Sequence, residues 1–221
     1  RGLGLGLVKK YLGNNEKVFC TTRNISKSKE LKLLKEKHTN NLEICELDLL
    51  DKNSPNILSN FLVNKPIDLF INNAGVIGQS AQHFKSISLN PWIEVLKVNL
   101  IAPLLITQSI IKNIEKSSEK RIYILSSKVG SIEDNKSGGM YVYRSSKTAL
   151  NQIVKSLSID LKPLGISVIS LHPGWVRTEM GGPNALISVE ESVNGMFGVI
   201  SNTNIKNSGQ FINYDGTQIP W

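Results

Sequence analysis

The chain alternates short apolar runs with segments of helical periodicity from one end to the other, and this alternation constrains the fold more than any other feature. Strand-like runs cover residues 18–22, 42–49, 67–71, 121–125, 166–171 and 210–214. Helical patterns fill the intervals between them. The alternation predicts an α/β fold of the Rossmann-like, doubly wound type, a mostly parallel sheet with helices on both faces. Because 221 residues contain no repeat or linker, we expect a single domain over residues 1–221.

The strongest helical pattern covers residues 140–161, and its first turns carry Tyr143 and Lys147. Four residues apart on a helix, a phenol and an ammonium lie on the same face. The cation then favours the phenolate and lowers the tyrosine pKa from about 10 toward neutral pH. Tyr143 is therefore a candidate general acid. A surface pair that shares a helix face by chance is the alternative, and the pair taken alone favours chance.

Composition argues against several classes of protein. The three histidines and the two cysteines, Cys20 and Cys45, have neither metal-ligand spacing nor the pattern of a disulfide framework, so we expect no metal site. No apolar run approaches the length of a membrane span and no signal peptide is evident, so we expect a cytoplasmic protein without membrane contact.

The formal net charge is +8, which raises the question of nucleic-acid binding. The lysines are spread over many segments, with a loose cluster over residues 27–37 on one predicted helix. A solvated helix face explains that cluster better than a nucleic-acid site. The charge is compatible with a small anionic ligand such as a phosphorylated cofactor.

A glycine-rich segment at the start of the chain runs directly into a helical pattern that ends near Gly13. Glycines such as Gly2 and Gly4 allow a helix N-terminus to approach a phosphate, whose charge it stabilises. A flexible or capping glycine cluster is an equally compatible interpretation. The dinucleotide fingerprint also requires a preceding strand and an earlier glycine, and the sequence has neither.

Polar residues follow several predicted strands, at the edge where parallel sheets bind ligands. Arg23 follows the run at 18–22, where a carboxylate would accept from a ribose 2′-hydroxyl and an arginine accommodates a 2′-phosphate. In a fold of this type Arg23 favours NADP(H) over NAD(H), with Arg1 as a second candidate contact. Taken alone, Arg23 is better explained as an exposed loop arginine. Asp48 either accepts from an adenine amine or caps a turn, and Asn99, among apolar neighbours, either bonds the backbone or joins a polar relay.

In their order and spacing, these segments resemble the short-chain dehydrogenase/reductase family over the whole chain. The matching motifs are Gly2-Leu3-Gly4, Asn72-Asn73-Ala74-Gly75, Asn99, Ser127, Tyr143 with Lys147, and Pro173-Gly174 with Thr178. More narrowly, the segments at 126–132, 138–141, 172–183 and 214–221 resemble the sniffer-type carbonyl reductases and the bacterial C-factor (C-signal) proteins.

The resemblance implies a catalytic role for four residues. Tyr143 protonates the substrate carbonyl oxygen as hydride arrives, and Lys147 lowers the tyrosine pKa and holds the nicotinamide ribose. Ser127, chosen over Ser126 on the family pattern alone, hydrogen-bonds the same oxygen. Asn99 supports a water relay to Lys147. Tyr141 is a rival to Tyr143, but the residue four positions after it is a serine.

The resemblance also implies a cofactor site. Its remaining contacts come from five segments, namely Arg1, Gly2, Leu3 and Gly4; Arg23; Asp48; Asn73, Ala74 and Gly75; and Pro173, Gly174, Val176 and Thr178. The expected activity is NADP(H)-dependent reduction of a small carbonyl compound. A non-catalytic, C-signal-like regulatory protein that keeps the fold is the alternative, and pairing of two copies is compatible with either.

One family element, the first strand at the centre of the sheet, has no counterpart in the sequence. Its absence predicts two unpaired strand edges in the middle of the sheet. We therefore expect an N-terminally truncated domain that folds poorly on its own and binds NADPH weakly.

Overall fold

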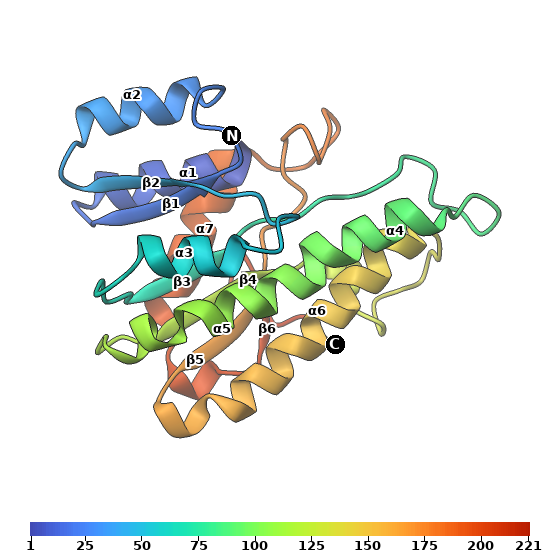
Figure 1. The fold of residues 1–221 in the computed structure, drawn as a ribbon. Helices are drawn as coiled ribbons and strands as arrows, with labels where there is room; N and C mark the ends of the chain where they lie inside the picture. The colour runs from blue at the N-terminus through green and yellow to red at the C-terminus, as the bar shows by residue number, and fades with distance from the viewer.

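The computed structural model describes all residues from Arg1 to Trp221 (Figure 1). As the sequence predicts, strands and helices alternate along the chain. The strands are β1 (Val18–Thr22), β2 (Leu42–Glu46), β3 (Leu69–Asn72), β4 (Arg121–Leu125), β5 (Ser167–His172) and β6 (Phe211–Asn213). The helices are α1 (Gly2–Gly13), α2 (Lys29–Lys37), α3 (Ser54–Phe61), α4 (Leu89–Leu96), α5 (Ala102–Glu115), α6 (Tyr141–Asp160) and α7 (Val189–Asn202). A π-helical turn, Lys97–Ile101, joins α4 to α5, and short 3-10 turns lie at Lys128–Gly130, Lys162–Leu164 and Ile205–Asn207.

All the pairings between these strands are parallel, but hydrogen bonding divides the strands into two sheets. One sheet contains β1 and β2, and the other has the order β3-β4-β5-β6. In the larger sheet Tyr123 lies opposite Ile71 on one side and Ile169 on the other. Because β1 and β3 do not pair with each other, each has an edge without a ladder. The two unpaired edges predicted from the sequence are thereby confirmed.

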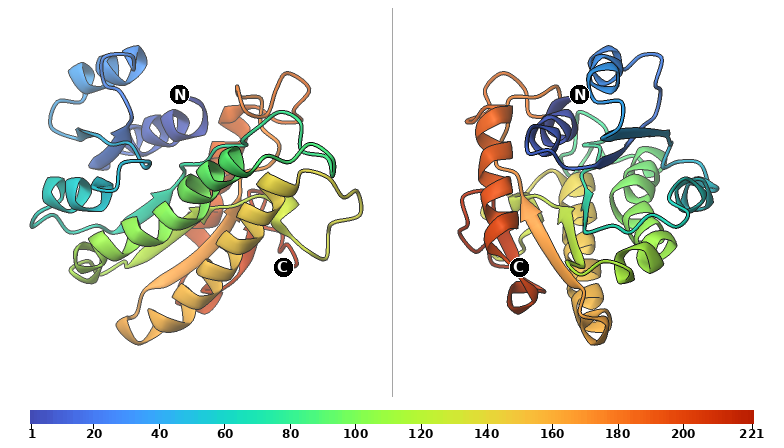
Figure 2. Two further views of the ribbon diagram at one scale, coloured as in Figure 1. Left: turned by 45° about the vertical axis from the view of Figure 1, so that its right-hand side comes forward. Right: turned by 90° about the vertical axis from the view of Figure 1, so that its left-hand side faces the viewer.

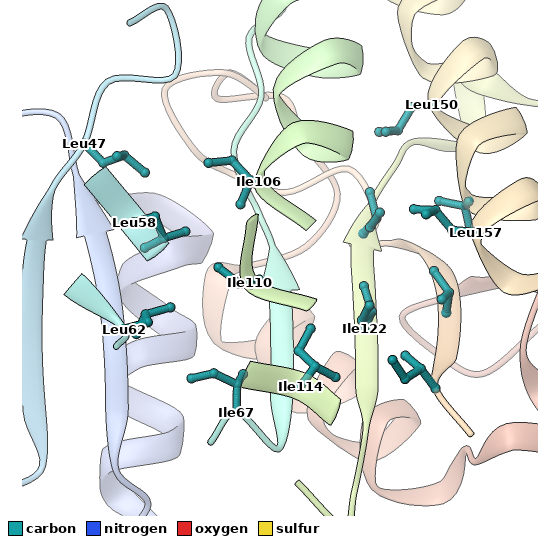
Figure 3. Close-up of a cluster of buried hydrophobic side chains, with 14 of the residues drawn as sticks. Leu47, Leu58, Leu62, Ile67, Ile106, Ile110, Ile114, Ile122, Leu150 and Leu157 are labelled. Atoms are coloured by element: carbon teal, nitrogen blue, oxygen red, sulfur yellow. The ribbon is translucent and has the colours of Figure 1, made fainter. Parts of the chain in front are cut away.

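Helices cover both faces of the sheets, as predicted (Figure 2). Alternate residues of β4 face opposite sides. Ile122 and Ile124 pack with Ile110 in a cluster built by α3, α5 and α6 (Figure 3). Tyr123 and Leu125 pack on the other side, in a cluster to which α1 and α7 contribute. The α/β class and the helical cover of both faces are thus confirmed.

Several element ends differ from the expected ones. The predicted strand over 42–49 is too long, because β2 ends at Glu46. Asp48 Oδ1 accepts from the Leu50 backbone N–H at 3.0 Å, so this carboxylate caps a turn, one of the two alternatives for it. At the start of α7, Ser188 caps the helix, since its Oγ accepts from the Glu191 N–H at 3.0 Å.

The continuous helical segment from Leu89 to Glu115 is long and apolar enough to cross a membrane by length and composition, with a mean hydropathy of 1.4. The sequence had not suggested such a segment. In the fold, 44% of the apolar stretch is buried inside the protein, where Ile106, Ile110 and Ile114 belong to the core. A core helix of a globular domain meets the same criteria.

Candidate active site

The candidate site forms where the carboxyl ends of β3, β4 and β5 meet the first turns of α6. Parallel strands bring their carboxyl ends to one edge of the sheet. Asn73 therefore follows β3, Ser126 and Ser127 follow β4, and Pro173 follows β5 at that same edge. Side chains far apart in the sequence are thus brought together.

Lys147 is the most deeply buried charged residue of the site. Its side chain projects from α6 toward the end of β4, and its Nζ donates to the Leu125 carbonyl oxygen at 2.8 Å. Only 4% of the residue is exposed. Burial lowers the pKa of Lys147 from 10.5 to about 8, because removal from water disfavours the charged ammonium.

Tyr143 precedes Lys147 by one turn of α6, and the Lys147 Nζ lies 5.9 Å from the centroid of the tyrosine ring. Burial raises the pKa of Tyr143, and a hydrogen bond with the Ser127 side chain partly opposes the rise. The expected fall in the tyrosine pKa is therefore not found in the protein alone. Desolvation of the phenol outweighs the favourable interactions, and Tyr143 is protonated at neutral pH, as a general acid must be.

The two serines after β4 differ in their contacts. Ser127 lies within hydrogen-bonding reach of Tyr143. Ser126 is 3% exposed, and its hydroxyl makes no hydrogen bond within the protein. The serine beside the candidate acid Tyr143 is therefore Ser127, the one chosen on the family pattern.

Asn99 lies in the π-helical turn and is fully buried. Its side chain makes a reciprocal pair of bonds with the Val76 backbone, accepting from the N–H and donating to the carbonyl, each at 2.8 Å. Its Nδ2 also donates to Ser146 Oγ at 3.0 Å. Asn99 thus bonds the backbone, one of the two alternatives for it, and also bonds the Ser146 side chain. π-Turns often occur at functional sites, where the extra residue redirects the helix.

Gly75 lies close to both Asn99 and Lys147. A Cβ on Gly75 would stand 3.5 Å from both Asn99 Oδ1 and Lys147 Nζ. The backbone after β3 therefore passes directly beside these polar groups, and a side chain there would occupy the space in front of them. Ala74 and Asn73, just before it, are exposed.

The glycine-rich segment forms the N-terminus of α1, beside the same edge. A Cβ on Gly4 would stand 2.8 Å from Asn73 Nδ2, and one on Gly2 would stand 3.6 Å from Thr178 Cγ2. Leu3 packs against the buried cluster shared by α1 and α7. The first turn of α1 thus joins the segments after β3 and β5.

The segment after β5 is held in a fixed turn. The Pro173 carbonyl accepts from Ser192 Oγ at 2.5 Å, and Gly174 adopts a positive φ of 83°. A Cβ on Gly174 would lie only 2.5 Å from Ile187 Cδ1. Val176 forms a bridge with Ile187, and Thr178 Oγ1 donates to the Val176 carbonyl at 3.3 Å. Residues 178–186 continue as a loop.

Three predicted cofactor contacts lie at the periphery. Arg23 is exposed after β1, and Asp48 is exposed after β2. Arg1 forms an ion pair with Glu179, so its guanidinium is engaged with the loop after β5. The structure places Arg23 and Asp48 at the carboxyl edge of the smaller sheet, and no hydrogen bond joins them.

Sequence reasoning missed Gln82, a buried residue whose side chain accepts from the Tyr143 backbone N–H at 2.9 Å. A single glutamine in an irregular loop carries no recognisable signal. No group of three His, Cys, Asp or Glu side chains lies close enough together to hold a metal ion.

Comparison with known proteins identifies the family. Residues 1–186 match the model of the short chain dehydrogenase family. The carbonyl reductase Sniffer of D. melanogaster has a similar structure, with a TM-score of 0.93 and 36% identity over 100% of this chain and 96% of that one. An NADPH-bound carbonyl reductase from chicken fatty liver gives a TM-score of 0.90 and 35% identity over 100% and 95%.

One relative, the C-signal of Myxococcus xanthus, is not named as an oxidoreductase. It is 40% identical over 156 residues, which cover 71% of this chain and 93% of the relative. An uncharacterized oxidoreductase of Schizosaccharomyces pombe is 30% identical over 100% of this chain and 94% of its own length. By these similarities the chain belongs to the short-chain dehydrogenase family of oxidoreductases.

Proposed function

We propose that this protein is an NADPH-dependent reductase of small carbonyl compounds. The observation that carries the proposal is the cluster of Ser127, a protonated Tyr143 and a buried Lys147 at the carboxyl edge of the sheet. A ketone or aldehyde reduction requires a proton donor at the carbonyl oxygen, and these three groups supply one.

The residues divide the chemistry between them. Tyr143 donates its phenolic proton to the carbonyl oxygen, while the Ser127 hydroxyl stabilises the negative charge that develops on that oxygen. Lys147 provides a positive charge one turn away and holds the ribose hydroxyls of the cofactor. Asn99, bonded to Val76, supports a water relay that returns a proton to Tyr143 through Lys147. The bound nicotinamide supplies the hydride.

The residues present fit a dinucleotide cofactor. The side-chain amide of Asn73, after β3, lies directly against Gly4 in the first turn of α1, 2.8 Å from where a Cβ would stand, so the end of β3 lies beside this helix N-terminus. A helix N-terminus with exposed backbone N–H groups favours phosphate. Gly75, Pro173, Gly174, Val176 and Thr178 continue the same edge and complete the proposed cofactor contacts.

Preference for NADPH over NADH rests on Arg23. It follows β1 where a carboxylate would favour NADH, and it is exposed and outside every ion pair in the structure. Several similar structures contain NADP, including carbonyl reductases from Pseudomonas aeruginosa and chicken fatty liver. Arg23→Ala should raise the Kd for NADPH about tenfold and leave that for NADH within about twofold.

The test of the proposed reaction is NADPH oxidation with a panel of aldehydes, diketones and quinones. Loss of the general acid in Tyr143→Phe should lower kcat by about 10² to 10⁴ while the Kd for NADPH is retained. Tyr141→Phe is the matched control, because Tyr141 lies two residues earlier on the same helix and is 44% exposed. Turnover that survives Tyr143→Phe would remove this residue from the mechanism.

A second candidate function is a non-catalytic signalling role, which the 40% identity to C-signal favours. In that case the fold and the cofactor site serve regulation, and the biological activity survives Tyr143→Phe. Measurable NADPH binding without turnover on any carbonyl of the panel would support this second function.

Two further parts of the proposal concern the setting of the enzyme. We propose a cytoplasmic location, with Cys20 and Cys45 as free thiols.

We also propose a homodimer through α5 and α6, whose shared groove of about 570 Å³ contains Leu104, Ile111 and Ile153. Ile153→Glu should halve the mass measured by light scattering if this groove is the interface, and an unchanged dimer mass would exclude it.

A further inference from the structure

The N-terminus of α6 has no cap from its own segment. Met140, the residue before the helix, adopts the left-handed conformation with φ 49° and makes no side-chain capping bond. The backbone N–H groups of a first helical turn need an acceptor from elsewhere. The acceptor is Gln82, whose Oε1 lies 2.9 Å from the Tyr143 backbone nitrogen.

Gln82 is held rigidly from both ends of its side-chain amide. The residue is 8% exposed, and its Nε2 donates to the carbonyl oxygens of Ile77, at 2.7 Å, and Gln79, at 2.9 Å. Its own carbonyl accepts from the Tyr141 N–H at 3.4 Å. A buried amide with these partners has a single orientation, so it fixes the position of the helix turn that it caps.

The same loop is bonded to Asn99 at its other end. Asn99 makes its reciprocal pair of bonds with Val76, and its Nδ2 also donates to Ser146 Oγ. Ser146 Oγ in turn donates to the Tyr143 carbonyl at 2.7 Å. Both backbone groups of Tyr143 are therefore bound to a polar ring that contains Gln82, the loop from Val76 to Gln82, Asn99 and Ser146.

We propose that Gln82 is a positioning residue for Tyr143, and that this hydrogen-bonded ring keeps the tyrosine and Asn99 in one fixed frame. The inference rests on the proposed role of Tyr143 as the proton donor. Without the Gln82 amide, the Tyr143 N–H in the first turn of α6 loses its hydrogen-bond acceptor. The Tyr143 phenol is then no longer held in a fixed position relative to Ser127. Misplacement of a reacting group by about 1 Å costs on the order of 10² in rate.

Two variants of Gln82 separate positioning from folding. Gln82→Met keeps the size of the side chain and removes both the acceptor and the donor. Gln82→Glu keeps the acceptor for the Tyr143 N–H and loses the donor to the loop carbonyls. The control is Gln79→Met, because the side chain of Gln79 holds the same loop through the backbone of Ala81, Ser86 and Ser88 and makes no hydrogen bond with α6.

We expect Gln82→Met to lower kcat by about 10- to 100-fold with the Kd for NADPH within about twofold of the wild-type value. Gln82→Glu should recover only part of that kcat, because its carboxylate keeps the acceptor for the Tyr143 N–H but is repelled by the carbonyl oxygens of Ile77 and Gln79. Its charge should raise the Tyr143 pKa and move the alkaline limb of the kcat profile to higher pH. Gln79→Met should leave both the kcat and that limb unchanged. Equal losses in Gln79→Met and Gln82→Met would overturn the proposal, since general loop disorder would explain them.

Amide hydrogen exchange gives a readout that does not depend on turnover. Gln82→Met should accelerate exchange over residues 141–146 at least tenfold, and Gln79→Met should not. Wild-type exchange rates in Gln82→Met would refute the positioning role. If the wild-type protein reduces no carbonyl in the panel, the proposed function fails, while the exchange data still decide whether Gln82 fixes this turn. Should Gln82→Met fail to fold, Gln82→Ala, which also removes the acceptor for the Tyr143 N–H, carries the same comparison against Gln79→Met.

Discussion

The Lys147 ammonium lies 5.9 Å from the centroid of the Tyr143 ring; Lys147 is buried and Tyr143 is partly buried. On an exposed helix this pair would shift the tyrosine pKa downward by charge attraction. Here burial raises the pKa of Tyr143 and lowers that of Lys147 to about 8. At neutral pH both groups are protonated, which is the state required for proton donation to a carbonyl.

The buried ammonium predicts a rise in stability at alkaline pH. The Lys147 pKa is about 8 in the folded protein and 10.5 for the free side chain, so the unfolded state binds more protons between these values. The free energy of unfolding therefore increases as pH rises through that window, by an amount on the order of 3 kcal/mol from this group. Urea unfolding from pH 7 to 10 measures it. Lys147→Met should remove the increase, and an identical slope in that variant would contradict the prediction.

The buried His172 predicts a loss of stability at acidic pH. Burial lowers its pKa to about 4 from 6.5, with the nearby Lys128 charge adding to the effect, and its Nδ1 makes no hydrogen bond within the protein. The unfolded state binds more protons between pH 4 and 6.5, so about 3 kcal/mol of stability is lost as pH falls through this window. Melting temperatures of wild type and His172→Asn at pH 7 and pH 4.5 test this. The difference between the two pH values should be smaller in the variant.

The two serines after β4 predict opposite outcomes for the same substitution. Ser127→Ala removes the hydroxyl that meets the Tyr143 phenol, and kcat should fall by about 10² to 10³. Ser126→Ala removes a buried hydroxyl without a partner, so kcat should stay within about twofold and the melting temperature should not fall. NADPH oxidation and thermal unfolding of both variants measure this. A larger loss in Ser126→Ala would exchange the roles of the two residues.

The fold was readable from the sequence because its signals are local. Ile122 and Ile124 alternate with Tyr123 and Leu125, and a strand whose neighbours are all apolar is buried on both faces. The polar residues that follow β3, β4 and β5 were expected at one edge, since parallel strands require it. Together these patterns predicted both the α/β class and the neighbourhood of the site.

Other parts of the site depend on contacts that no local pattern encodes. The π-turn that holds Asn99 inserts one residue into a helix whose apolar periodicity continues through it. Gln82 acts through the backbone of a residue 61 positions away. The shift in the Tyr143 pKa depends on how deeply the phenol is buried, which spacing on a helix does not reveal.

The first turn of α1 predicts that cofactor binding is sensitive to a single methyl group. In Gly4→Ala the new Cβ would lie 2.8 Å from Asn73 Nδ2, so that side chain must move. We expect the Kd for NADPH to rise about five- to tenfold, which corresponds to about 1 kcal/mol. Gly13→Ala, at the other end of the same helix, meets no atom within 4 Å and is the control. Fluorescence titration with NADPH should separate the two, and equal Kd values would exclude the α1 N-terminus from the cofactor site.

The division of the strands into two sheets predicts uneven hydrogen exchange. β1 bonds only to β2, and β3 bonds only to β4, so the backbone N–H groups on their facing edges have no ladder partner. An N–H outside a ladder exchanges through small local openings, whereas a ladder N–H in the core requires a larger unfolding event. Alternate amides of Val18–Thr22 and Leu69–Asn72 should therefore exchange at least tenfold faster than those of β4, which is bonded on both sides. Exchange resolved by residue tests this. Uniform protection across β1, β3 and β4 would mean that the two edges are covered in solution.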